Sequence, residues 1–227
     1  MERLLPPGLQ LAEQPFTPSN LHPVYFAFNL KQQNVTTPIP FIKLNYTEFA
    51  VGIPFVQIKG VANPVSYAYS PVLYLNSLLG TIGGRLFFSL PKHFVHIDLD
   101  TGPAPGTQSF EASQLFNNSN RYLKAAFNND GPAMPSNNSP HFLQVKPMLN
   151  QALVVYDSVK GFRSTSYRME GLDTCTIQPI SGTCNTADMM NGLEHQNLTL
   201  QSINASVLGT FQIEYDWTLN KAEPVNQ

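Results

Sequence analysis

The sequence predicts a single, mainly β domain (α+β) with a few short helices. Its 227 residues include 19 prolines and 14 glycines, spread along the chain in a rhythm typical of short strands joined by turns. In several segments apolar and polar residues alternate, as they do when one face of a strand is buried. Hydrophobic residues make up 42% of the chain, and no shift in composition marks a boundary. We therefore expect one domain over residues 1–227.

In the first half of the chain, residues 1–23 are an irregular, proline-rich lead-in. Strands are expected at residues 25–30, 41–56 and 65–69. In the second of them, Tyr46 and Glu48 fall on the same face, because side chains alternate along a strand. Residues 71–80 have leucines at helical spacing between a proline and a glycine, which predicts a short buried helix.

In the second half, residues 94–100 alternate cleanly, with Val95 and Ile97 on one face and His96 and Asp98 on the other. This pattern predicts a half-exposed strand. Further along we expect loops at 101–110 and 128–140, a helix at 112–127, and strands at 142–145, 152–158 and 207–219. The strands at 44–58, 94–99 and 207–219 are expected to join one continuous sheet system.

Charged residues are unusually scarce and limit the possible partners. Asp, Glu, Lys and Arg make up 12% of the chain, the formal net charge is −2, and Lys and Arg do not cluster. We therefore expect neither nucleic acid nor an anionic membrane surface as a partner. No apolar run reaches the ~18–20 residues that span a bilayer, and no signal peptide is visible. The compartment stays open, with a slight preference for the cytoplasm, and a small ligand in an enclosed pocket is favoured.

Cys175 and Cys184 flank a turn-rich stretch. They are either two unpaired thiols or, in an oxidising compartment, a disulfide that closes this short loop. Without a Cys-x-x-Cys spacing, redox catalysis is not expected. Six Asn-x-Ser/Thr sequences matter only in a secretory pathway; they start at Asn34, Asn45, Asn117, Asn137, Asn197 and Asn204.

The best candidate for chemistry is Lys92, which directly follows Pro91 and has apolar neighbours. Desolvation disfavours the ammonium form of a lysine, and a neutral amine can attack a ketone to give a Schiff base that acts as an electron sink. Residue types alone would favour a surface lysine at a turn, so the hypothesis depends on the wider segment. A metal site at His96, Asp98 and Asp100 is conceivable, but solvent-facing residues on an edge strand explain them better, and we expect no metal.

The segment Gly-Gly-Arg-Leu-Phe-Phe-Ser-Leu-Pro-Lys-His at residues 83–93 resembles the Gly-Arg…Pro-Lys-Lys signature of the acetoacetate decarboxylase family. Three earlier segments resemble that family in the same order, at residues 4–9, 46–54 and 69–76. The resemblance covers roughly residues 4–100. It implies a double-cone or barrel of antiparallel strands, imine chemistry without a cofactor, a small-molecule oxo acid as substrate, and a homo-oligomer.

The resemblance also implies roles for individual residues. Lys92 would be the nucleophile, with Glu48 and His93 as its catalytic neighbours. The residues implied to bind substrate are Arg85, Tyr46, Tyr69 and Phe88, although Arg85 could instead be structural. We expect Lys92 and Glu48 to converge on one enclosed, mostly apolar cavity.

The sequence departs from the family pattern at several positions. His93 replaces the usual second lysine, Leu86 replaces a glutamate, and residues 57–69 contain no acid. The family's first strand, with an arginine for the substrate carboxylate, would lie before Met1. These departures weaken the case for acetoacetate itself more than the case for imine chemistry.

Three functions are therefore considered. The first is a Schiff-base lyase that decarboxylates a small β-keto acid. The second is an imine-forming aldolase-dehydratase or cyclase on a larger oxo acid, which the missing acid and the Lys-His pair favour modestly. The third is a non-catalytic domain that binds a small molecule in the same cavity.

Overall fold

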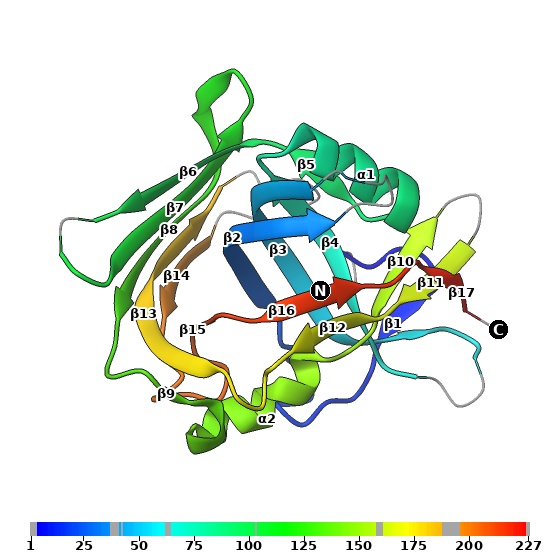
Figure 1. Cartoon of the computed structure of the whole chain (residues 1–227). Coiled ribbons are helices and arrows are strands. Elements are labelled where there is room, and N and C mark those ends of the chain that lie inside the picture. The colour runs from blue at the N-terminus through cyan, green and yellow to red at the C-terminus, as the bar shows by residue number, and fades with distance from the viewer. Residues whose placement is uncertain are drawn as a thin grey trace. The chain divides into compact units, whose positions relative to one another are not determined.

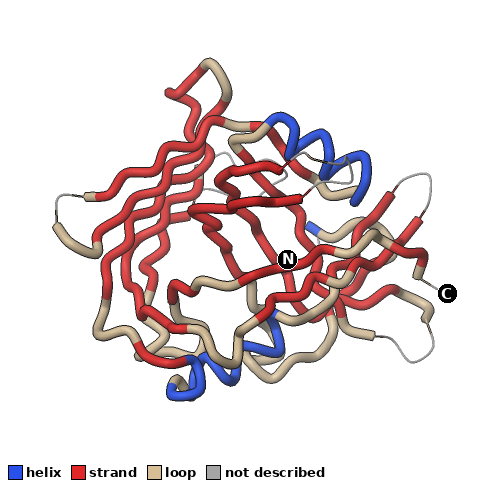
Figure 2. Tube along the Cα trace, in the orientation of Figure 1, coloured by secondary structure: helices blue, strands red, loops and turns tan. Residues whose placement is uncertain are grey.

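Strands dominate the computed structural model, which describes residues 4–36, 41, 43–61, 65–102, 104–157, 161–187 and 196–225 (Figures 1 and 2). The prediction of a mainly β fold with few helices is confirmed. The chain folds as two compact units. Unit 1 comprises Met1–Val95, Gln151–Arg168 and Leu219–Gln227, and unit 2 comprises His96–Asn150 and Met169–Thr218.

Unit 1 is built on an eight-stranded sheet in the order β1-β3-β4-β10-β11-β17, with β2 pairing β3 and β5 pairing β4. Its strands are β1 (Leu9–Leu11), β2 (Tyr25–Thr36), β3 (Lys43–Ile58), β4 (Tyr67–Leu75), β5 (Lys92–Phe94), β10 (Leu153–Asp157), β11 (Gly161–Thr165) and β17 (Glu223–Pro224). Strands β2, β3 and β4 pair antiparallel. Both β10 and β5 pair parallel with β4, β10 near its start and β5 near its end. The strands expected at 25–30, 41–56 and 152–158 are present, with shifted ends.

The prediction of a helix at residues 71–80 is wrong. Residues Pro71 to Leu75 complete β4, and the helix α1 (Leu78–Phe88) begins later. The start of α1 is set by Ser77, whose Oγ accepts a hydrogen bond from the Gly80 amide at 3.1 Å. Ser77 is thus the N-cap of the helix, and Pro71 does not mark the helix start. Pro71 is tolerated in β4 because the β3–β4 register shifts at this point, and a bulge needs no ladder hydrogen bond from proline.

The core of unit 1 lies in two apolar clusters. One, which we call the Leu9 cluster, contains Leu9, Ile53, Val56, Ile58, Tyr67 and Val154. The other, which we call the Tyr46 cluster, contains Tyr46, Leu73, Leu75, Leu90, Val155 and Ala222. The Tyr46 cluster surrounds the start of β5, and it is the apolar setting of Lys92.

Unit 2 contains a seven-stranded sheet in the order β14-β13-β8-β7-β6, with β15 and β9 also pairing β13. Its elements are β6 (His96–Thr101), β7 (Thr107–Gln114), β8 (Asn117–Asn129), β9 (Met134–Pro135), the 3-10 turn η2 (Ser136–Asn138), α2 (Pro140–Leu149), β13 (Thr176–Thr186), β14 (Gln196–Leu200) and β15 (Phe211–Ile213). A separate two-stranded sheet pairs β12 (Tyr167–Glu170) with β16 (Asp216–Leu219).

Several expectations for this half of the chain are wrong. The helix expected at 112–127 is the β7–β8 hairpin, which also includes residues 107–110 of an expected loop. In β8 the buried residues Leu123, Ala125 and Phe127 alternate with the exposed Lys124 and Ala126, so burial overrides helix propensity. Residues 142–145 lie in α2, not in a strand, because Ser139 accepts a hydrogen bond from the Phe142 amide and Pro140 occupies the first turn.

The expected single sheet system is also wrong. Strand β3 belongs to the eight-stranded sheet and β6 to the seven-stranded one. The long strand expected at 207–219 is two short strands, β15 and β16, which belong to different sheets. Alternation reports which faces of a strand are buried, and it carries no information about which strand lies alongside.

Both cysteines are free. The stretch between them is not a loop, because residues 176–186 form the continuous strand β13 and Cys175 immediately precedes it. An extended strand rises ~3.3 Å per residue, so the two Cα atoms lie far beyond the ~7 Å that a disulfide allows. Burial raises the pKa of the Cys184 thiol to about 11. In the described part of the chain, no helix is both long enough and apolar enough to cross a bilayer.

Candidate active site

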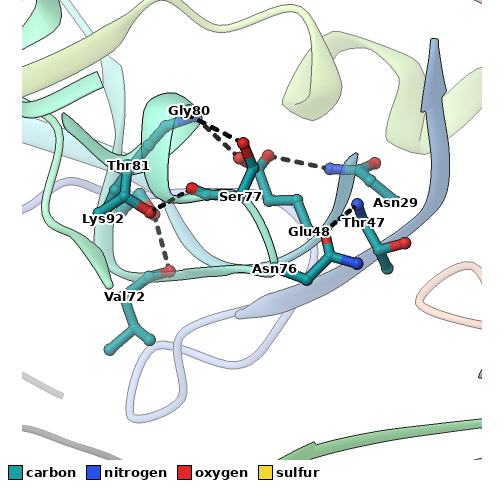
Figure 3. Close-up of polar contacts among 10 residues, drawn as sticks. Asn29, Thr47, Glu48, Val72, Asn76, Ser77, Gly80, Thr81 and Lys92 are labelled. Atoms are coloured by element: carbon teal, nitrogen blue, oxygen red, sulfur yellow. Dashed lines mark hydrogen bonds and ion pairs between the residues drawn. The ribbon is translucent and has the colours of Figure 1, made fainter. Parts of the chain in front are cut away.

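Lys92 and Glu48 meet on one face of the unit 1 sheet. In the strand register, Glu48 lies opposite Leu75, and Leu73 lies opposite Lys92. Residues two apart on a strand share a face, so this register places both charged side chains on the same side. The Nζ atom of Lys92 lies 3.0 Å from Oε2 of Glu48, and the two side chains are 8% and 12% exposed (Figure 3). The result is a buried ion pair.

The second oxygen of Glu48 also has a partner. Asn29 of β2 lies directly opposite Glu48 in the β2–β3 ladder, and its Nδ2 donates to Oε1 at 3.2 Å. Figure 3 shows the carboxylate reached by the asparagine amide on one side and by the lysine amine on the other. The orientation of the carboxylate is therefore fixed from both sides.

The stem and amine of Lys92 are closely packed. Its Nζ lies 5.4 Å from the ring centroid of Tyr46, within the range of a cation–π contact. Its methylenes pass over Gly84 of α1, where a Cβ atom would lie 2.3 Å from Lys92 Cδ. A glycine is thus required at this position for the helix to lie over the lysine.

Arg85 connects α1 to the strand that carries Lys92. Its Nε donates to the backbone carbonyl of Lys92 at 2.5 Å, and its Nη2 lies 3.4 Å from Nδ1 of His93. The guanidinium group thus holds the backbone of β5, which matches the structural role left open for this arginine.

His93 points to the other face of the sheet, because it follows Lys92 in an extended strand. Its ring packs edge-on against Tyr74, with centroids 6.0 Å apart. Burial lowers the pKa of His93, and the nearby Arg85 charge lowers it further. The structure therefore places the His93 imidazole on the face of β5 that points away from the Lys92 amine.

The two remaining expected residues are separated. Phe88 packs against the Tyr46 cluster, whereas Tyr69 packs against the Leu9 cluster, and burial raises the pKa of Tyr69. Tyr69 lines a cavity of about 90 Å³, together with Ser70, Ser89, Leu90, Pro91, Leu153, Val154, Val155 and Tyr156. Lys92 and Glu48 do not line that cavity. Tight packing encloses the Lys92–Glu48 ion pair. The cavity lined by Tyr69 is therefore not the cavity that we expected around Lys92 and Glu48.

Asn29 and the supports of the Lys92–Glu48 pair were not found from the sequence. Thr47, next to Glu48, donates its amide to Asn76 Oδ1 at 2.8 Å, which ties β3 to the turn before α1 (Figure 3). The signal available was Asn76-Ser77 before an apolar run, a pattern typical of a helix start. Asn29 left no signal, because its role depends on the pairing of β2 with β3.

No group of three or more His, Cys, Asp or Glu side chains that could hold a metal occurs among the described residues. His96 Nε2 lies 3.0 Å from Asp98 Oδ2 on the exposed strand β6.

Comparison with known proteins identifies a family and similar folds. The family model "Acetoacetate decarboxylase (ADC)" matches residues 1–166, and no curated protein matches. Among solved structures, acetoacetate decarboxylase from Legionella pneumophila is similar with a TM-score of 0.53 and 15% identity, over 88% of this chain and 77% of that one. The enduracididine biosynthesis enzyme MppR complexed with pyruvate has a TM-score of 0.56 and 16% identity, over 98% of this chain and 81% of that one. At these identities the likeness is one of fold.

Proposed function

Because this chain belongs to the acetoacetate decarboxylase family, we propose that it is a cofactor-independent lyase in which Lys92 forms an imine with a small β-keto acid. The observation that carries the proposal is the buried contact of 3.0 Å between Lys92 Nζ and Glu48 Oε2. It supplies the two groups that imine formation needs, an amine and an adjacent proton acceptor, in an apolar setting.

The first half of the reaction begins with a proton transfer. Lys92 Nζ gives a proton to Glu48 Oε2, and the neutral amine attacks the ketone carbon of the substrate. Glu48 returns the proton to the departing hydroxyl, so water leaves and an iminium remains. The net change is the conversion of an ammonium and a ketone into an iminium and water.

In the second half, the C–C bond to the β-carboxylate breaks and its electron pair moves into the iminium. This step releases CO2 and leaves a neutral enamine. A solvent proton adds to the enamine carbon, and water then hydrolyses the iminium to release the ketone and restore the Lys92 ammonium. The apolar Tyr46 cluster favours the charge-neutralising step, because a low dielectric disfavours separated charges.

A second outcome of the same imine is an aldolase-dehydratase reaction, in which the enamine attacks an aldehyde. It is supported by the similarity to MppR, one structure of which holds the condensation product of pyruvate and imidazole 4-carboxaldehyde. It is also supported by residues 57–69, which contain no second acid.

Borohydride trapping tests the proposal. The purified protein is incubated with β-keto acids or with pyruvate and reduced with borohydride. Its intact mass is then measured by mass spectrometry. We expect a mass increase that equals one reduced imine per chain, with CO2 released from the β-keto acids. Trapping without CO2, but with consumption of an added aldehyde, would favour the aldolase-dehydratase. An unchanged mass with all the oxo acids, together with ligand binding by calorimetry, would identify a binding domain instead.

We also propose that the protein assembles with copies of itself through the outer face of α1. The residues that α1 buries are small, namely Gly80, Thr81 and Gly84. Five of its large apolar side chains are instead 41–72% exposed, and they are Leu78, Leu79, Ile82, Leu86 and Phe87. Arg85, the helix's charged residue, is engaged with β5. In a two-fold interface a patch meets its own copy, and an uncharged patch does so without repulsion.

A charge on this face tests the assembly. We expect the wild-type protein to sediment as an oligomer and Ile82→Asp to sediment as a monomer, because burying an unpaired carboxylate is costly. Leu208→Asp, a matched change at an exposed leucine of unit 2, should leave the oligomer intact. A monomeric wild type, or an Ile82→Asp variant that still assembles, would contradict the role of α1.

A further inference from the structure

Asn29 is a half-buried residue that contacts the Lys92–Glu48 ion pair through Glu48. No step of the proposed reaction uses Asn29. It lies directly opposite Glu48 in the β2–β3 ladder, and its Nδ2 donates to Glu48 Oε1 at 3.2 Å. Lys92 Nζ takes the other oxygen, Oε2, at 3.0 Å. The two oxygens of one carboxylate therefore have different partners from different strands (Figure 3).

We propose that Asn29 is a positioning residue, which holds Glu48 so that Oε2 faces the amine throughout imine formation. The terminal torsion of a glutamate has a broad energy profile, so an unrestrained carboxylate could turn either oxygen to Lys92 or swing away once the lysine loses its charge. The amide of Asn29 prevents both movements. This inference rests on the proposed imine chemistry for its meaning, but the contact itself can be tested apart from it.

An amide suits this position better than a charged donor. When Lys92 becomes an imine, Glu48 must remain in place to return the proton to the departing hydroxyl. A lysine or arginine at position 29 would compete with Lys92 for the carboxylate, whereas a neutral amide donates one hydrogen bond and adds no charge. Asn29 therefore fixes the geometry of Glu48 without weakening its pairing with Lys92.

The charged and titratable groups around Glu48 come from two elements. Lys92 faces it from β5, and Tyr46 lies two residues away on the same face of β3, next to the Lys92 amine. The residue opposite Glu48 on β4 is Leu75. Arg85 of α1 is turned towards the Lys92 carbonyl and His93. A new acid at position 29 would thus act on Glu48 directly.

Asn29→Asp makes the sharpest test, because it replaces the donor by an acceptor of the same shape. Two carboxylates in contact share a proton, so the carboxyl pair in Asn29→Asp should take up a proton at a pH about one unit or more higher than the wild-type site does. The acid limb of the trapping rate should move by the same amount. Asn29→Ala should slow trapping by ~10- to 100-fold, as expected when a catalytic group is misplaced by about 1 Å, with little change in the oxo-acid concentration that gives half the maximal rate.

Asn34→Asp is the matched control, since it makes the same change at an exposed asparagine of the same strand. It should leave the pH profile unchanged. Carbon-13 NMR of glutamate side-chain carboxyls, with the Glu48 signal identified by its loss in Glu48→Gln, follows the proton on Glu48 without any substrate. A shift of that signal in Asn29→Asp alone supports the inference even if no oxo acid is trapped, in which case only the proposed function fails. Wild-type trapping kinetics in Asn29→Ala, or an equal shift in Asn34→Asp, would overturn it.

Discussion

Replacing Lys92 by arginine is expected to abolish borohydride trapping and leave the protein folded. A guanidinium group keeps the positive charge beside Glu48, but it stays protonated and does not form an imine with a ketone. Intact-mass analysis after reduction should show no adduct with any of the oxo acids that modify the wild type. An adduct on Lys92→Arg would mean that another of the chain's lysines is the nucleophile.

Lys92→Met separates the loss of chemistry from the loss of charge. Methionine has a similar length and no charge, so it also prevents trapping, but it leaves the buried Glu48 carboxylate without its cation. Removing one partner of a buried ion pair costs about 3–5 kcal/mol, which urea denaturation can measure. Combining it with Glu48→Gln should recover part of that stability. Equal stability of the arginine and methionine variants would show that the pair contributes little to the fold.

The position of the strand that carries Glu48 was predictable, and the structure places Tyr46, Thr47, Glu48 and Phe49 in β3. Its burial does not follow a period of two, because Tyr46, Thr47 and Phe49 are all buried. Pairing between strands was not predictable. The hairpin at 107–129 was taken partly as a loop and partly as a helix, since a segment such as residues 112–127 suits either a helix or a strand until its partner strands are known.

The site could be predicted only in part, for a similar reason. Lys92 and Glu48 were found because short motifs carry them, and the structure brings them together. His93 was assigned from the family resemblance, as the residue in place of a second lysine, and its side chain points to the opposite face of the strand from that of Lys92. Asn29 was missed because its contact with Glu48 exists only across the β2–β3 ladder.

Gly84→Ala is expected to disturb the site more than any other change of a single methyl group. The new Cβ would lie 2.3 Å from Lys92 Cδ and 2.7 Å from Cε, far closer than two carbon atoms can approach. The lysine stem cannot move aside freely, because its amine is bound to Glu48 and its backbone carbonyl is held by Arg85. Either α1 lifts from β5 or the amine leaves Glu48.

Both outcomes should be measurable against a neighbouring glycine of the same helix. Overpacking of this kind costs about 1–3 kcal/mol, and displacement of the amine by about 1 Å should slow trapping by ~100-fold. At Gly83 a new Cβ would find its nearest neighbour, Phe87 Cδ2, at 4.0 Å, an ordinary contact. Gly83→Ala should therefore stabilise α1 by about 0.5–1 kcal/mol and leave trapping unchanged. Equal trapping rates in the two variants would show that Lys92 does not depend on the close approach of α1, and that the glycine of the Gly-Arg pair has no part in placing the amine.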